Sequence, residues 1–231
     1  MNKWLAVPLV TVMLSGCATF NQFTGQEAAT LDREQYIAEL SKEIEAVGFN
    51  RVEIQAGVDE FLNVCASLLE RQYTVMGEYR TLAANHVDVQ AFLKAHQGLA
   101  EEELLAAMFE FDSGATSDNE KISTKFAAYE AALEAISAKN TELGLEITVN
   151  LAQATLIMKD HAQAVAFASG TNLLNSFLGE GEKTADNDLG LAILRAKDQI
   201  SLASEANKII SLEQETIKQI NALQAELEAK G

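Results

Sequence analysis

Proline, cysteine and aromatic residues are scarce in this chain. Its 231 residues include one proline and two cysteines, and 6% of them are aromatic. The single proline is Pro8, so no proline interrupts a helix anywhere in the rest of the sequence. The composition therefore leaves long helices free to form.

Basic residues are also few. The chain has 17 Lys and Arg against 34 Asp and Glu, for a net charge of -17. This balance argues against nucleic acid as a partner, because phosphate binding requires a basic face that releases counterions. It also disfavours direct adsorption to anionic lipid headgroups. With 48% hydrophobic residues, however, the chain has enough apolar surface to form one sizeable core.

The first 16 residues have the pattern of a signal peptide. Lys3 supplies a positive start, and an uncharged, mostly apolar run follows from Trp4 to Met13. This run is too short to cross a bilayer as a helix, which takes about 20 residues. We therefore expect residues 1–16 to be a leader that is removed.

The leader ends in the tetrapeptide Leu14-Ser15-Gly16-Cys17. It resembles the lipobox of bacterial lipoproteins, in which Leu, a small residue and Gly or Ala precede the cysteine, and all four positions match. The resemblance covers roughly the first 20 residues. It implies that diacylglycerol is attached to the Cys17 thiol, that the leader is cleaved before this residue, and that the new amino group is acylated. Three acyl chains would anchor the protein permanently, since two membrane signals already suffice.

The same resemblance implies a location. In the enterobacterial sorting pattern an Asp just after the lipidated cysteine favours the inner membrane, whereas this chain has Ala18. We therefore expect a lipid anchor in the bacterial outer membrane, with the protein facing the periplasm. Residues 17–29 would form the lipidated tether. Cys65 would then be the only free cysteine, which rules out an intramolecular disulfide.

Residues 30–231 carry apolar side chains at alternating steps of three and four, which is the spacing of one helix face. The pattern predicts helices over residues 31–47, 50–82, 88–96, 100–111, 117–168 and 189–229. The apolar face of the second helix is expected to begin at Ile54, and the apolar stripe of the last helix is expected to include Ile210 and Ile217. We expect an all-α domain, an elongated and mainly antiparallel bundle of three to four long helices with short capping helices at one end.

Several residues have the pattern of helix ends. Gly48 is expected to end the first helix as its C-cap. Asn50 with Glu53, and Ser117 with Glu120, have the spacing of capping boxes and are expected to begin the second helix and the longest helix.

A few polar or reactive residues fall on the predicted apolar faces. Cys65 lies on the apolar face of the second helix, and we expect it to be buried, with a disulfide link between two copies as the alternative. We interpret Asn140 and Asn150, on the longest helix, as polar positions that set its register. His161 on the same face is predicted to be a hydrogen-bonded core histidine. Neither the histidines nor the acidic residues 180–188 have the spacing of a metal site, so no metal is expected.

Residues 161–179 form a run without a formal charge, where the two longest helices are expected to turn. Its polar residues make it unsuited to span a membrane. The run is either an apolar hairpin end that packs beneath the short helices or an exposed docking patch for a partner or a lipid. The residues of this patch would be Val165, Phe167, Leu173, Leu174, Phe177 and Leu178.

The chain has no recognisable catalytic or nucleotide-binding motif, so neither a catalytic residue nor a cofactor is expected. We predict a non-enzymatic, lipid-anchored scaffold or accessory protein of an envelope assembly, attached to the membrane through Cys17 and bound to a protein partner. Its oligomeric state stays open, because heptads specify a partner helix without naming its chain. The alternative is a membrane-active helical module that binds lipid or a hydrophobic ligand through residues 161–179.

Overall fold

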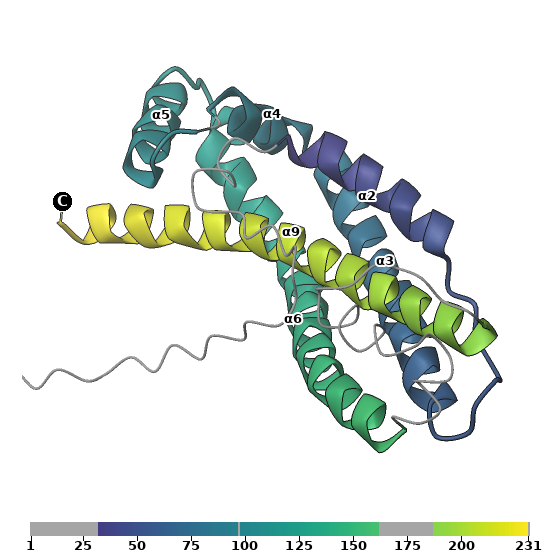
Figure 1. Ribbon diagram of the computed structural model, residues 1–231. Coiled ribbons are helices and arrows are strands. Elements are labelled where there is room, and N and C mark those ends of the chain that lie inside the picture. Colours follow the sequence, from purple (N-terminus) through teal and green to yellow (C-terminus); the bar gives the residue numbers. More distant parts are fainter. Residues whose placement is uncertain (1–31, 97, 162–186, 231) are drawn as a thin grey trace, which may run out of the picture.

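The structure is a computed structural model that describes residues 32–96, 98–161 and 187–230. Every regular element in these ranges is helical, which confirms the predicted all-α bundle (Figure 1). The elements are α2 (Arg33–Val47), α3 (Asp59–Asn85), α4 (Val87–Ala95), α5 (Glu101–Ser113), the 3-10 helix η1 (Asp118–Glu120), α6 (Ile122–Asp160) and α9 (Asp188–Lys230).

Three long helices form the centre of the bundle. They are α3, α6 and α9, with 27, 39 and 43 residues, and each of them packs against the other two. The shorter α2 packs mainly against α9. In Figure 1, α9 crosses α6, while α4 and α5 lie together near the beginning of α6. The two short helices therefore cover one end of the bundle.

The core lies where the inner faces of these helices meet. Each buried aliphatic or aromatic side chain stabilises the fold by about 1.5–3 kcal/mol relative to an exposed one. The predicted apolar faces of α3, α6 and α9 are buried as expected over their described parts. Among the buried residues are Phe61, Leu68, Leu69 and Met76 of α3, Phe126, Tyr129, Leu143 and Ile147 of α6, and Ile193, Ile200, Ile210 and Ile217 of α9.

The first described helix begins and ends at residues with the expected chemistry. The Asp32 carboxylate caps α2 by accepting a hydrogen bond from the Gln35 amide at 3.2 Å. At the other end, Gly48 has φ +72° and donates its N–H to the Ile44 carbonyl at 2.9 Å. This backbone conformation favours glycine, which confirms the predicted C-cap.

The beginning of α3 differs from the prediction. Asn50 does not start a helix with Glu53, and α3 begins only at Asp59. The reason is a turn in which Gly57 has φ +85° and the Asp59 carboxylate accepts the Gln55 amide at 2.9 Å. The chain therefore reverses direction over residues that the capping-box pattern assigned to the helix.

The segment before this turn is held against α3 by a side chain. The Asn63 amide group accepts the Val52 N–H at 2.8 Å and donates to the Val52 carbonyl at 3.0 Å. Ile54, which we expected to be the first core position of the helix, is 44% exposed in this segment. The predicted apolar face was therefore wrong at its first position.

The beginning of α6 also differs from the predicted capping box. Glu120 accepts hydrogen bonds from the Thr116 amide and hydroxyl, at 2.9 and 2.8 Å, and the Ser117 side chain makes no capping bond. The α6 N-terminus is capped from a distance by the Asp112 carboxylate, which accepts the Ile122 N–H at 2.6 Å. A carboxylate ten positions back in the chain therefore fixes where this helix starts.

The end of α6 comes earlier than residue 168. The helix ends at Asp160, so its 39 residues span about 58 Å at 1.5 Å per residue. His161 follows as the C-cap, with φ -106° and ψ 25°. Its ring lies against the turn before α3, since a Cβ added at Gly57 would come within 2.7 Å of the His161 Cε1. No described helix is long and apolar enough to cross a membrane.

Candidate functional site

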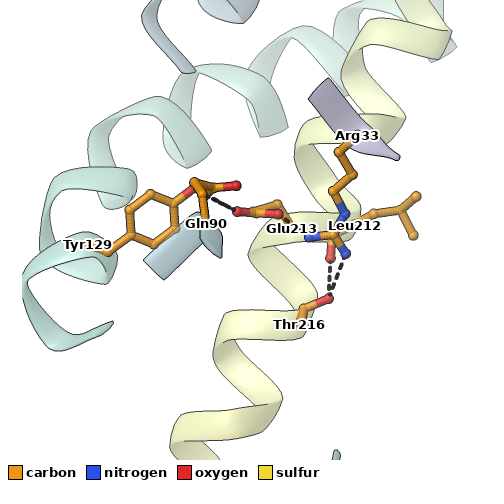
Figure 2. Close-up of polar contacts among 6 residues, drawn as sticks. All are labelled: Arg33, Gln90, Tyr129, Leu212, Glu213 and Thr216. Atoms are coloured by element: carbon orange, nitrogen blue, oxygen red, sulfur yellow. Dashed lines mark hydrogen bonds and ion pairs between the residues drawn. The ribbon is translucent and has the colours of Figure 1, made fainter. Parts of the chain in front are cut away.

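A fully buried acidic residue lies where four helices meet. The Glu213 side chain of α9 has no exposed surface, and its Oε1 accepts the Tyr129 hydroxyl at 2.7 Å and the Gln90 amide at 3.0 Å. Its Oε2 forms an ion pair with the Arg33 guanidinium, which also donates to the Thr216 hydroxyl at 3.3 Å. Figure 2 shows the carboxylate between Tyr129 and Gln90 on one side and Arg33 on the other.

The buried negative charge of Glu213 is compensated by the positive charge of Arg33 and by hydrogen bonds. Removing a carboxylate from water costs several kcal/mol unless a partner and further hydrogen bonds compensate it. The Glu213 side chain is 0% exposed, whereas the Arg33 side chain is 20% exposed and reaches solvent. The cluster therefore joins α2, α4, α6 and α9 through one carboxylate.

Two buried tyrosines share this environment. Burial raises the pKa of Tyr129 well above its ordinary value of 10, and the nearby negative charge of Glu213 raises it further. The pKa of Tyr79 is raised for the same two reasons, with burial again the larger cause. Both phenols therefore stay protonated at neutral pH, where Tyr129 serves as a hydrogen-bond donor and not as a general base.

The arrangement is suited to holding helices together. Both carboxylate oxygens of Glu213 are already occupied by donors of the same chain, from Tyr129, Gln90 and Arg33. A satisfied buried network of this kind contributes rigidity and a unique packing. The cluster therefore stabilises the packing of the helices.

A second buried polar layer crosses the three long helices. Asn140 of α6 is fully buried and accepts a hydrogen bond from the Gln72 amide of α3 at 2.8 Å. It donates to the Asn207 carbonyl and the Ser211 hydroxyl of α9, at 2.9 and 3.0 Å. The Asn207 amide returns a bond to the Asn140 side chain at 3.0 Å. Buried amides of this kind specify the alignment of packed helices, which is the role predicted for Asn140.

Asn150, the other asparagine predicted to set the register of α6, does not bond to a neighbouring helix as Asn140 does. Asn150 is half-buried, and its amide donates to the Glu146 carbonyl one turn earlier at 2.8 Å. This bond lies within a single helix.

The predicted site residues fall into two groups. Cys17 and the six residues of the predicted patch, Val165, Phe167, Leu173, Leu174, Phe177 and Leu178, lie outside the described residues. Cys65 lies within them and is buried, as expected. Burial raises the pKa of its thiol to about 12. This thiol is therefore inert under ordinary conditions.

The three histidines lie apart and serve as helix ends. His86 joins α3 to α4 and packs edge-on against Tyr129, with ring centroids 5.3 Å apart. His96 ends α4, and its Nδ1 lies 2.9 Å from the Phe92 carbonyl oxygen. His161, which we expected inside the core of the longest helix, is half-buried at its end.

The described surface has shallow hollows, two of which are lined by both polar and apolar side chains. One, of about 200 Å³, is lined by Asp188 and Arg195 together with apolar side chains near Val52. The other, of about 240 Å³, lies between α3 and α6 and includes Glu60 and Gln153. Across residues 32–96, 98–161 and 187–230, no three His, Cys, Asp or Glu side chains are grouped to hold a metal ion.

Two residues of the buried polar network were missed by sequence reasoning. Asn207 and Glu213 were left out of the apolar stripe of the last helix, although both are at core spacing. Asn207 lies three residues before Ile210, and Glu213 lies three residues after it and four before Ile217. The position of Glu213 between two isoleucines, and that of Asn207 one turn before Ile210, were usable signals, because a polar residue on a core stripe requires a partner.

Comparison of the chain with known protein families, with curated proteins and with solved structures finds no match.

Proposed function

We propose that this protein is a non-enzymatic, lipid-anchored scaffold or accessory protein on the periplasmic side of a bacterial outer membrane. The observation that carries the proposal is the tetrapeptide Leu14-Ser15-Gly16-Cys17, which ends a short leader and matches every position of a lipobox. Lipidation at Cys17 places the helical domain at a membrane surface.

The length of the tether and the chemistry of the core support this role. Residues 18–32 separate Cys17 from α2, the first described helix, and a chain of this length reaches at most about 50 Å. The domain therefore works close to the membrane. The buried carboxylate of Glu213 and the amide of Asn140 bind other groups of the same chain, so these polar groups stabilise the bundle.

Metabolic labelling tests the anchor directly. In a bacterial host supplied with an alkyne analogue of palmitate, we expect the full-length protein to incorporate the label and to sediment with membranes. Cys17→Ser should abolish both properties, whereas the control Cys65→Ala should retain the label. An unlabelled wild-type protein, or a Cys17→Ser variant that still carries the label, would refute lipidation at this residue.

The expected outer-membrane location has its own test. In an enterobacterial host, membranes separated by density should contain the wild-type protein in the outer-membrane fraction. Ala18→Asp should move it to the inner membrane without reducing the lipid label. A wild-type protein in the inner-membrane fraction would contradict the proposed location while leaving the anchor intact.

The scaffold role is tested by crosslinking in native membranes followed by purification through a C-terminal tag. We expect a discrete crosslinked partner, which should be lost or reduced when Cys17→Ser releases the protein from the membrane. Recovery of the chain as a free monomer under the same conditions would count against a scaffold.

The alternative is a module that contacts lipid or a hydrophobic ligand through residues 161–179. The observation that favours it is the absence of any formal charge over these residues, in a chain with 22% charged residues. Exchange of Phe167, Leu174 and Phe177 for Ser should then abolish liposome binding by the chain without its leader, with unchanged thermal stability. A loss of stability instead would assign these residues to the core.

A further inference from the structure

The outer face of α6 carries a second apolar stripe, which the core does not use. Its positions follow one another at alternating steps of three and four, and all of them are exposed. Leu145, Val149 and Leu156 are 66%, 54% and 61% exposed. The stripe consists of Ala128, Ala131, Ala135, Ala138, Glu142, Leu145, Val149, Ala152 and Leu156.

Helix propensity alone does not explain this face. Alanine is the best helix former, so exposed alanines could serve the helix itself. Val149, however, is β-branched and a weaker helix former, and it is exposed about one turn after Leu145 and two turns before Leu156. A heptad of apolar residues on the surface of a helix is the pattern that packs against another helix.

The stripe is divided by size. Its first half, from Ala128 to Ala138, contains only alanine, and its second half, from Leu145 to Leu156, contains the large side chains. A partner helix that fits must present large residues where this helix has small ones, and small residues where it has large ones. The same helix in the reverse direction has that order.

We propose that this face binds a second copy of the chain, with the two α6 helices antiparallel. The proposal goes beyond the proposed function and does not depend on the lipid anchor. Two antiparallel registers pair eight of the nine stripe residues, with facing positions that add up to 280 or to 287. The first would place Lys139 beside Lys139 of the other copy, so we take the register with the sum 287. Ala131 then faces Leu156 and Ala138 faces Val149, each a small residue against a larger one, while Ala135 faces Ala152 and Glu142 faces Leu145.

The charges beside the stripe fit the same register. Lys139 and Glu146 lie on one edge of the stripe, where each forms an ion pair with α3, to Glu78 at 2.7 Å and to Arg71 at 2.6 Å. In the antiparallel pair, Lys139 of one copy lies beside Glu146 of the other, and this contact occurs twice by symmetry. Unlike charges therefore meet at the two symmetry-related contacts along this edge.

A parallel pair fits less well. It would place Glu142 on Glu142 at the centre of the contact and would set alanine against alanine over the first half of the stripe. The overall charge of -17 repels a second copy at most orientations. Two copies are therefore expected to meet at a face that carries little charge. The stripe on α6 is such a face, because Glu142 is its one acidic residue.

The size of the contact sets its strength. From Ala131 to Leu156 the stripe is about 38 Å long, at 1.5 Å per residue. A contact of one helix width over this length buries roughly 400 Å² on each copy, which is at the low end for specific interfaces. We therefore expect a weak, reversible dimer.

Sedimentation velocity over a range of about 1 µM to 1 mM measures this equilibrium. The chain from residue 18 onward is used, because it contains every described helix. We expect a concentration-dependent dimer, at least tenfold weaker in the double variant Leu145→Glu/Val149→Glu. The matched control is Phe109→Glu, which replaces a residue of α5 that is 50% exposed and outside the stripe. It should change the dissociation constant less than twofold.

Thiol crosslinking tests the register. A mixture of the Ala138→Cys and Val149→Cys chains should form a disulfide-linked heterodimer, while each variant alone should not form a homodimer. The buried Cys65 remains in place in all chains. In a parallel pair the homodimers would form and the heterodimer would not.

Three results would overturn the proposal. They are a wild-type chain that remains monomeric at about 1 mM, homodimer disulfides at position 138 or 149, and equal weakening of the dimer by Phe109→Glu and the Leu145→Glu/Val149→Glu variant. Circular dichroism of all variants confirms that each one is folded. A crosslink from position 149 to another site within the same chain would assign the face to an intrachain contact and would also refute the dimer.

Discussion

Gly144 of α6 lies directly against the side chain of Asn207 of α9. A Cβ added at position 144 would come within 2.9 Å of the Asn207 Oδ1. Asn207 is held in this place, because its amide nitrogen donates to both the carbonyl and the side-chain oxygen of Asn140. The glycine therefore allows the two helices to approach at the level of the buried amide layer.

Gly144→Ala should destabilise the protein by about 1–2 kcal/mol, although alanine is normally the better helix residue by about 1 kcal/mol. The added methyl group must displace Asn207 and weaken its bonds to Asn140. Urea denaturation followed by circular dichroism measures the change. The matched control is Gly77→Ala in α3, where an added Cβ has no neighbour within 4 Å. This control should be stabilising, and equal effects of both variants would contradict the packing argument.

Arg33→Met should cost about 3 kcal/mol of stability, because it leaves the Glu213 carboxylate buried without its cation. Glu213→Gln should cost less, since the remaining Arg33 side chain is 20% exposed and can be hydrated. The double variant Arg33→Met/Glu213→Gln should be more stable than Arg33→Met alone. Denaturation of the four proteins gives this double-mutant cycle, and additive losses would refute the coupling.

An exposed ion pair provides the comparison. Arg71 and Glu146 are joined at 2.6 Å, but their side chains are 46% and 36% exposed. Arg71→Met should therefore cost less than about 1 kcal/mol. A loss as large as that of Arg33→Met would mean that burial does not determine the strength of these pairs.

Glu205→Gln should stabilise the protein at pH 7. Burial raises the pKa of Glu205 above its ordinary value, and the negative charge of Glu43 contributes in the same direction. Because this pKa is higher in the folded state than in the unfolded state, ionisation of Glu205 lowers the free energy of unfolding. The contribution of the protonated group to stability is therefore present at low pH and is lost as the pH rises through the folded-state pKa. Thermal unfolding should show a gain for the variant at pH 7 that disappears near pH 4.

The control for this experiment is Glu215→Gln, which removes one negative charge from an exposed position of the same helix. It should give a smaller change at pH 7. The Tyr36 hydroxyl, which donates to Glu205 at 3.3 Å, can donate equally to the new amide oxygen. If both variants gain the same stability, the effect comes from total charge and not from the burial of Glu205.

Cys65 should react with a thiol reagent only when the protein unfolds. Its side chain is fully buried, and burial raises the thiol pKa to about 12, so little thiolate forms at pH 8. The chain from residue 18 onward has no other cysteine. Labelling by Ellman's reagent should therefore be slow in buffer and fast in concentrated urea, and rapid labelling of the folded protein would contradict the burial.

The long helices could be predicted because their core positions repeat in the sequence itself. The spacing that predicted a helix over residues 189–229 agrees with α9 at Asp188–Lys230. Helix ends were less accessible, because distant side chains determine them. Asp112 caps a helix that begins ten residues later, and α6 ends where His161 meets Gly57, a residue of another part of the chain.

The cluster around Glu213 could also be predicted from the sequence only in part. The stripe of α9 could have identified Glu213 as a buried acid, because a charged residue lies at core spacing. Nothing local identifies Arg33 as its partner, since the two residues are 180 positions apart. Such a pairing depends on how α2 packs against α9, which the pattern of either helix alone does not contain.

The Arg33–Glu213 pair also has a mechanical consequence. Arg33 is the first residue of α2, and Asp32 before it forms an ion pair with Lys94 of α4 at 3.2 Å, so a pull that reaches the beginning of α2 acts on both contacts. The load passes from Arg33 to Glu213 and from there, through Tyr129 and Gln90, to α6 and α4. A force at the beginning of α2 is thereby shared by four helices at once, and α2 resists being peeled from the bundle.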